Sequence, residues 1–493
     1  GSPRIKMRVS LLCLLLAASA FADPAADLEK ELKQEGDNIE EVQEVIHELD
    51  EHLREELGPQ GDDKDELAQL EEEEEKDCNK DKAAPMKEDL KDSGAPDMNE
   101  LNKAAGLEKD LFEGDLMLNP TQMELVAEAD LAGNRSRRQA MLNAGYSWGA
   151  NNGEIPFKYS NGYPSNRYGP IETAMKFWTD KTCVTFRRAT STDKNVVEVR
   201  ESAGCSSNVG KIGGTQALNL GQGCMNIGTI AHELSHTLGM FHVQSRYDRD
   251  QYVLIDTTNI QKGMEHNFNK EGQDTTNNYN LPYEFGSNMH YGAGDFGINA
   301  NKPVLVAKTA NKAYQNGMMG RMPTFYDVML VNSHYKCYDN CKSKPACANG
   351  GVVDVRSCSK CVCPLSWAGN LCNERPAGTK TLSATSAAQK FSVNMGQYQG
   401  KEGTTYQTQN YLITAPSGKR IAITPTYQGT QWSNSCAGMG AEVQFKADKR
   451  MAGTQICDWR VSYEPIVSED NSVFVQVYTL GGQVAVDFSY QAV

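Results

Sequence analysis

A group of three histidines near the middle of the chain has the clearest chemical meaning. His232 and His236 are four residues apart, so on a helix both imidazoles lie on one face and can bind the same metal ion. Gly239 allows the positive φ with which the chain can leave the helix sharply, and His242 can then reach the ion from another direction. Three neutral nitrogen ligands that leave one position open for water are typical of a catalytic zinc site.

Glu233 is adjacent to the first histidine but points away from the ligand face. Its carboxylate can take a proton from a zinc-bound water and return it to a leaving amine, which predicts a general base in peptide hydrolysis. A structural zinc site, or two surface histidines on a helix, is the alternative. Structural sites normally fill the fourth position with cysteine, and no cysteine lies between Cys224 and Cys337. We therefore expect one catalytic Zn²⁺ and no other cofactor.

The helix and the turn that must position these residues can also be located. Residues 226–238 are expected to form the helix, with Asn226 as its N-cap. Further along the chain, Met289 lies in the sequence Ser-Asn-Met-His-Tyr, where a tight turn would place its side chain as an apolar floor under the imidazoles. A single methionine is more often an ordinary core residue. Together with the histidine motif, it predicts the Met-turn of metzincins.

The histidine motif and the Met-turn together resemble the astacin family of metzincin zinc endopeptidases. The family continues its motif after the third histidine with five further positions, matched here by Gln244, Arg246, Asp248, Arg249 and Asp250. The resemblance implies an α+β catalytic domain with a deep active-site cleft over residues 139–337. It also implies that Tyr291 stabilises the oxyanion, and that residues 213–221 form the edge strand along which an extended substrate lies.

An acidic segment, residues 23–138, precedes this domain. It holds 37 acidic residues against 14 lysines and arginines, and few aromatics, which predicts a largely disordered propeptide. The rest of the chain has no such excess, and nothing in its charge supports a nucleic-acid partner. Residues 112–115 look like the FxGD motif of astacin propeptides, whose aspartate coordinates zinc in place of the catalytic water. Asp115 is therefore expected to be a zinc ligand in the zymogen only.

The end of this acidic segment contains a basic site. Arg135, Arg137 and Arg138 lie within four residues, and processing proteases of the subtilisin type need several basic side chains of this kind. A solvated basic loop is the alternative. The position between an acidic segment and a globular one favours cleavage by an activating protease.

Val243 is a departure from the family pattern. Many astacins place a glutamate directly after the third histidine, where it pairs with the buried amino terminus of the mature enzyme. An ammonium could not be buried against valine without a large penalty, so we expect the mature terminus of this chain to lie elsewhere or not to be trimmed to one fixed residue.

Residues 1–22 predict a leader and a secretory signal peptide. Met7 and Arg8, the apolar run 11–16 and the small residues at 20–22 follow the usual charged, apolar and small order. A membrane anchor is the alternative, but the apolar run is much shorter than the roughly 20 residues that span a bilayer. We therefore expect a secreted, extracellular protein with no membrane partner.

The cysteines group in even sets, which in an exported chain indicates disulfides closed within modules. Residues 338–373 follow the cysteine order of an EGF-like module. Residues 374–493 alternate apolar and polar positions in short runs, which predicts an all-β sandwich, and the resemblance makes it a CUB-like domain. Such a tail is especially common among nematode astacins. The resemblances imply the pairs Cys183–Cys337, Cys205–Cys224, Cys341–Cys358, Cys347–Cys361 and Cys363–Cys372, and leave Cys436 to pair with Cys457.

These features predict a zinc endopeptidase that is secreted as a zymogen and hydrolyses extracellular matrix, cuticle-type or other structural proteins. Its expected partners are protein substrates and an activating protease. An extracellular binding or adhesion protein, which acts through the EGF-like and CUB-like modules with a non-essential peptidase domain, is the alternative. The intact general base, zinc ligands, oxyanion partner and zymogen aspartate favour the enzyme.

Overall fold

The computed structural model describes residues 98–107, 111–118, 122, 140–141, 144–151, 153–271, 276–396, 405–428 and 436–493. The expected signal peptide, the acidic stretch before residue 98 and the basic cleavage site at 135–138 lie outside these residues. Within them, no helix is both long enough and apolar enough to cross a membrane.

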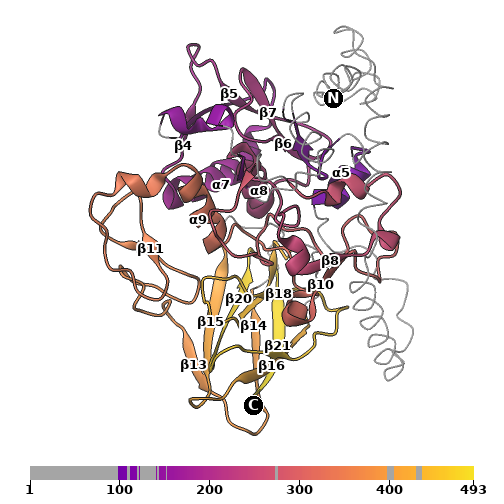
Figure 1. Ribbon diagram of the computed structural model, residues 1–493, viewed down its shortest axis with the longest axis vertical. Coiled ribbons are helices and arrows are strands. Elements are labelled where there is room, and N and C mark those ends of the chain that lie inside the picture. Colours follow the sequence, from indigo (N-terminus) through magenta and orange to yellow (C-terminus); the bar gives the residue numbers. More distant parts are fainter. Residues whose placement is uncertain are drawn as a thin grey trace.

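The first half of the described chain is built on a mixed sheet (Figure 1). Its strand order is β1-β6-β7-β5-β3-β4, and neighbouring strands run parallel except β6 and β7. Val197 and Val199 of β5 are fully buried and Glu198 between them is not, which is the alternation of a strand with one covered face. The strands are β1 (Leu116–Met117), β3 (Glu154–Tyr159), β4 (Thr185–Arg188), β5 (Val196–Arg200), β6 (Cys205–Asn208) and β7 (Thr215–Leu220).

The strand expected at the substrate edge is an interior strand, so the prediction that residues 213–221 form an edge is wrong. β7 lies between β5 and β6, with Ser207 opposite Leu218. The reversal between β6 and β7 uses Gly213 and Gly214 at φ of 96° and 61°, a conformation that glycine adopts readily. β6 is the next strand outward, and its other side pairs with β1.

Two helices pack against this sheet and against each other (Figure 1). α7 (Tyr168–Lys181) buries Ile171, Met175 and Trp178 at helical spacing. The Trp178 indole donates a hydrogen bond of 3.1 Å to a carbonyl of α8 (Ile227–Thr237). α8 begins where the Asn226 side chain accepts a hydrogen bond of 2.8 Å from a first-turn amide, which makes Asn226 its N-cap.

The chain between α8 and residue 337 has little regular structure. Within it, β8 (Val253–Ile255) pairs with β10 (Leu305–Ala307). β9 (Thr276–Asn277) pairs with β2 (Ala140–Met141), which comes earlier in the chain. α9 (Phe325–His334) begins with a capping box between Thr324 and Asp327. A short helix, α5 (Met98–Ala104), precedes the sheet in the chain.

The C-terminal part is first rich in disulfides and then all β. Beyond the pair β11 (Val352–Val353) and β12 (Cys361–Val362), the chain forms a five-stranded sheet, β13-β15-β20-β17-β18, and a four-stranded sheet, β14-β21-β16-β19. The two sheets pack together, and the rings of Phe391 and Tyr411 from opposite sheets lie 4.8 Å apart. Their strands are β13 (Lys380–Ser383), β14 (Gln389–Met395), β15 (Gln407–Thr414), β16 (Ile421–Tyr427), β17 (Met439–Gln444), β18 (Thr454–Ile456), β19 (Ile466–Val467), β20 (Ser472–Thr479) and β21 (Val484–Ala492).

Disulfides close each part of the described chain. They join the same cysteines that were paired from the sequence, namely Cys183–Cys337, Cys205–Cys224, Cys341–Cys358, Cys347–Cys361, Cys363–Cys372 and Cys436–Cys457. Cys183–Cys337 fixes the residues after α9 to the end of α7, and Cys205–Cys224 ties β6 to the turn before α8. The second bridge therefore holds β6 beside the helix that carries the histidines.

Candidate metal centre

Helix α8 presents the first two histidines to the interior of the protein. His232 and His236 lie one turn apart, and both side chains are buried. The helix ends at Thr237, and two residues later Gly239 has a φ of 91°, the left-handed conformation expected from the sequence. The chain then turns back, so that the buried His242 comes to lie beside the other two imidazoles.

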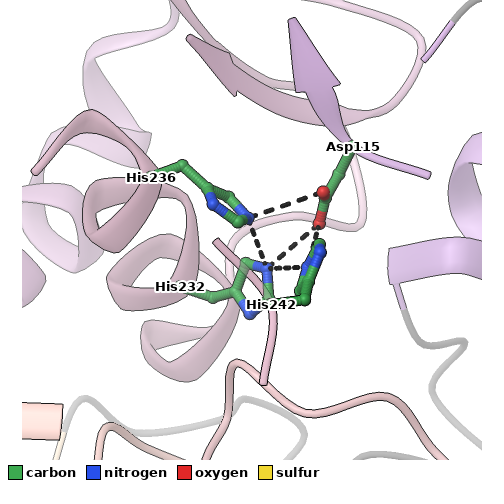
Figure 2. A group of neighbouring side chains, drawn as sticks. All are labelled: Asp115, His232, His236 and His242. Atoms are coloured by element: carbon green, nitrogen blue, oxygen red, sulfur yellow. Dashed lines mark hydrogen bonds and ion pairs between the residues drawn. The ribbon is translucent and has the colours of Figure 1, made fainter. Parts of the chain in front are cut away.

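The three histidines converge with one carboxylate (Figure 2). Nε2 of His232 lies 2.9 Å from Nε2 of His236 and 3.2 Å from Nε2 of His242. The Asp115 carboxylate approaches these three nitrogens at 3.0, 3.5 and 3.3 Å respectively. One candidate ligand atom from each residue lies within 4.8 Å of the others. The structure thus brings together the four predicted zinc ligands.

The hydrogen bonds of the three Nδ1 atoms determine what the three converging Nε2 atoms can bind. Nδ1 of His232 and Nδ1 of His236 face main-chain carbonyl oxygens at 2.5 and 2.7 Å. Nδ1 of His242 faces the Glu113 carboxylate at 2.7 Å. Carbonyl and carboxylate oxygens accept hydrogen bonds, so each Nδ1 donates and each Nε2 keeps a lone pair that points inward. Three lone pairs and a carboxylate, with no donor among them, fit a cation, and this donor set fits zinc.

The pKa values of the two carboxyl groups near the histidines, Asp115 and Glu233, are shifted in opposite directions. Burial would raise the pKa of Asp115, but the positive charge that His242 and His236 carry when protonated outweighs burial and holds that pKa well below its ordinary value. Burial, with the charge of Asp115 added, raises the pKa of Glu233 well above its ordinary value. Both oxygens of Glu233 are buried and lack a hydrogen-bond partner among the described residues. Asp115 is therefore the ionised ligand, and Glu233 is a carboxyl group without a fixed partner.

The Met-turn and the tyrosine after it lie beside the third histidine. Met289 is buried, and its carbonyl accepts a hydrogen bond of 2.8 Å from Val243, directly after His242. The rings of Tyr291 and His242 lie 4.8 Å apart, and the Tyr291 hydroxyl donates to the main-chain carbonyl of Glu113 at 2.7 Å. Burial raises the pKa of Tyr291 well above its ordinary value, so the hydroxyl keeps its proton and remains a donor.

A tight hairpin carries Asp115 into the site. Phe112 and Leu116 exchange two main-chain hydrogen bonds of 3.1 and 2.8 Å. Between them, Glu113 and Gly114 have φ of 46° and 74°. A Cβ at Gly114 would lie 2.7 Å from the nearest side-chain atom, so the glycine is required both by its conformation and by its close contacts.

Glu113 is a functional residue that the sequence did not reveal. Its buried carboxylate accepts from Nδ1 of His242, while Asp115 faces Nε2 of the same ring. One hairpin therefore contacts both nitrogens of the third ligand. Glu113 lies within the FxGD motif, and that position is the one signal that could have indicated it.

The family positions that follow the third histidine shape the loop beside the site. Arg249 is buried and donates to the main-chain carbonyl of Gln244 at 3.1 Å. The side chain of Gln244 in turn accepts from the amide of Tyr291 at 3.2 Å. Arg246 forms a two-point ion pair with Asp248 at 2.9 and 2.8 Å. These residues hold the loop and Tyr291 and do not contribute metal ligands.

Comparison with known proteins identifies the family. Residues 140–336 match the peptidase family described as Astacin. Two similar proteins of Caenorhabditis elegans are zinc metalloproteinase nas-31, 34% identical, and zinc metalloproteinase nas-23, 32% identical. These alignments cover 73% and 78% of this chain, and 60% and 72% of the relatives. The chain therefore spans less than two thirds of the length of nas-31 and more than two thirds of the length of nas-23.

A solved structure also matches part of the chain. It is high choriolytic enzyme 1, a hatching-enzyme zinc protease from the medaka Oryzias latipes, at 36% identity. The match covers 40% of this chain and 98% of that protein, with a TM-score of 0.36.

Proposed function

The chain belongs to the astacin family of zinc metalloproteinases, and from that membership we propose that it is a secreted endopeptidase made as a zymogen. The observation that carries the proposal is the convergence of three buried imidazoles, each with an inward Nε2, beside the unpartnered carboxyl of Glu233. A site that only held structure would not need a buried acid without a partner, because leaving such a group unpaired costs free energy.

In peptide hydrolysis, His232, His236 and His242 would hold the metal, which when bound polarises a peptide carbonyl and increases the acidity of water. Glu233 would take a proton from the attacking water at a carboxylate oxygen and deliver it to the nitrogen of the leaving amine. The Tyr291 hydroxyl would donate to the oxygen of the scissile carbonyl as negative charge develops there. Its present hydrogen bond to a main-chain carbonyl supports this role.

The hairpin with Asp115 would keep the precursor latent. Asp115 would occupy the metal coordination position that a water must fill for the reaction. The main-chain carbonyl of Glu113 accepts the hydrogen bond that the Tyr291 hydroxyl would donate to the substrate. Cleavage near Arg135, Arg137 and Arg138 by an activating protease would separate this hairpin from the rest of the chain. The proposed substrates are extracellular matrix, cuticle-type or other structural proteins, and the proposed location is extracellular.

The general base is tested by Glu233→Gln in the processed protein. We expect kcat/KM on a fluorogenic peptide or on gelatin to fall by about 100-fold or more, since general acid–base catalysis is usually of that size. The zinc content, measured by atomic absorption, should stay at one ion per chain. Equal cleavage rates for the variant and the parent would remove the proposed peptidase function.

Latency is tested in a precursor whose three arginines are changed to glutamine, so that it is not cleaved. Asp115→Ala in this background should raise peptide hydrolysis at least about tenfold, because the inhibiting carboxylate is lost. Unchanged hydrolysis would remove Asp115 from its assigned role.

A further inference from the structure

Residues 317–321 lie between the Met-turn and the C-terminal sheets. On one side, Gly320 donates a main-chain hydrogen bond of 3.0 Å to Ser287, at the start of the Met-turn. On the other side, the Gly317 carbonyl accepts 3.2 Å from the amide of Gln455 in β18. A Cβ on either glycine would lie 2.0 Å from a neighbouring oxygen. The segment is therefore held by direct backbone contact on both faces.

Arg321 extends from this segment into the five-stranded sheet. Its guanidinium lies 3.7 Å from the centre of the Tyr478 ring, and its nitrogens contact Glu442 at 3.2 Å and Gln476 at 2.5 Å. The side chain is only 10% exposed. Burial opposes its charge, but Tyr478 and Glu442 outweigh burial and raise the pKa of Arg321. A permanently charged group thus fixes the segment to β17 and β20.

The main chain of Arg321 leads to the helix that carries the histidines. A Cβ on Gly228, in the first turn of α8, would lie 2.0 Å from the Arg321 carbonyl oxygen, so the two backbones touch with no side chain between them. Asn288 donates to the Gly228 carbonyl at 3.2 Å, and its own carbonyl accepts from Nδ1 of His232. Four successive contacts, beginning with that of the Arg321 side chain, therefore connect the C-terminal sheet with the first zinc ligand.

A second contact supports the Met-turn from the same side. Ala452, in the hairpin between β17 and β18, donates to the Glu284 carboxyl group at 3.2 Å and accepts from the Tyr314 hydroxyl at 2.8 Å. Glu442 accepts from the amide of Gly453 at 2.9 Å. Glu442 thus contacts both Arg321 and this hairpin, so the two supports form one network.

We propose that Arg321 is a positioning residue for the zinc site, and that the C-terminal sheets hold α8 and the Met-turn from outside. This inference rests on the proposed peptidase function. A buried ion pair often adds little to stability compared with apolar residues of the same shape. What the charged contact supplies here is one fixed position for residues 317–321, and through Gly228 and Asn288 one orientation of the His232 ring.

The test uses the full chain, processed and loaded with Co²⁺ in place of zinc, because the visible spectrum of cobalt reports ligand geometry without any substrate. Arg321→Met should alter that spectrum and speed the loss of cobalt to a chelator. In the zinc form it should lower kcat at least about tenfold with little change in KM, as expected when the support of a metal ligand is lost. Arg321→Lys keeps the charge, so its spectrum, cobalt release and kcat should each lie between those of Arg321→Met and those of the parent.

Arg460→Met is the matched control, because Arg460 pairs with Asp458 in the same domain and both belong to its surface turn. It should leave the spectrum and kcat unchanged. A lower unfolding temperature for Arg321→Met with an unchanged spectrum, cobalt release and kcat would overturn the proposal, since it would leave only a stabilising contact.

If Arg321→Met does not fold, Glu442→Gln tests the same network with an isosteric side chain. A smaller change of the spectrum and of cobalt release in the same direction would support the proposal, and wild-type values would overturn it. Because both readouts are independent of catalysis, a failure of the proposed peptidase function would be recognised separately, as absent cleavage by the wild-type protein.

Discussion

His242 is contacted at both ring nitrogens by residues of one hairpin, residues 112–116. Glu113 accepts from Nδ1 at 2.7 Å, and Asp115 approaches Nε2 at 3.3 Å. An acceptor at the outer nitrogen orients a histidine ligand and increases its basicity. Under the proposed processing Glu113 would leave with the propeptide, so the third ligand would have this carboxylate in the precursor and lack it in the processed enzyme. We therefore expect the precursor to hold zinc more tightly than the processed enzyme.

Glu113→Ala should weaken zinc retention in the precursor that cannot be cleaved. Loss of such an acceptor usually costs about 10- to 100-fold in metal affinity, so zinc should pass to a chelating indicator correspondingly faster. Glu113→Gln retains an accepting oxygen and should stay near the parent. The proposed processing would remove residue 113, so all three proteins should give the same kcat/KM once cleaved. Equal zinc release from the three precursors would contradict this role.

At the scale of residues, the separation of two contacting residues along the sequence determines whether their contact can be predicted. His232, His236 and His242 lie within one helix and its exit, so their spacing alone implies a common ligand face. Glu113 and His242 are 129 residues apart, and no local pattern relates them. Asp115 was found only because its motif is known from a family, and its place beside the imidazoles depends on a hairpin that spacing alone does not define.

At the scale of elements, the hairpin is held by its neighbours. Asn102 of α5 donates to the Gly114 carbonyl at 2.8 Å and to the Cys205 carbonyl at 2.7 Å, and it accepts from the Cys205 amide at 2.8 Å. β1 then continues the sheet alongside β6. α5 buries only Met98 and Asn102, so its sequence resembles the polar segment around it and did not predict a docked helix.

The strand arrangement was mispredicted for a related reason. Residues 213–221 have the composition of a strand and do form β7, but its neighbours cannot be read from that composition. β7 folds back along β6, which lies between β7 and β1 and is held there by the Cys205–Cys224 disulfide. Strand existence depends on local side chains, whereas strand order depends on long-range pairing.

Asn102→Ala should release the hairpin more easily. The change removes three hydrogen bonds at a buried position, each of about 1 kcal/mol, while leaving Asp115 and Glu113 intact. The delay between cleavage at the basic site and the appearance of peptidase activity should therefore be shorter in the variant than in the parent. A gel assay for the cut and a fluorogenic assay for activity, taken from the same samples, measure that delay.

Ala104→Ser, an exposed change on the same helix, is the control for this experiment. It should keep the delay of the parent. The same delay in Asn102→Ala and Ala104→Ser would mean that α5 does not contribute to holding the hairpin.

At the scale of the whole molecule, the C-terminal sheets and the catalytic half share a polar, buried boundary. The Tyr326 hydroxyl of α9 donates to Asp448 at 2.6 Å, and Arg321 reaches Glu442 across 121 residues of sequence. The sequence predicted separate modules from their cysteine and strand patterns, which describe each module alone. Contacts between modules depend on surfaces that form only after each has folded, so no pattern in the chain indicates them.

Glu284, at this boundary, should make the stability of the protein depend on pH. Burial first, and then the charges of Asp327 and Glu442, raises the pKa of Glu284 well above its usual value of 4.5. Tyr314 and Tyr326 also face it, and their own pKa values are raised, so both stay neutral. The folded protein therefore keeps the Glu284 proton at a pH where the unfolded chain releases it. This contribution to stability is complete below about pH 4.5 and is lost as the pH rises toward the folded pKa.

Glu284→Gln removes that titration while keeping the size of the side chain and an oxygen for the amide of Ala452. As the pH rises above about 5, the parent should lose stability relative to the variant by at most about 1.4 kcal/mol per pH unit. Asp327, whose pKa burial also raises, remains in both proteins. Urea unfolding midpoints measured across this range give the difference. Parallel curves for the two proteins would mean that Glu284 is ionised at the boundary and that the folded state tolerates its charge.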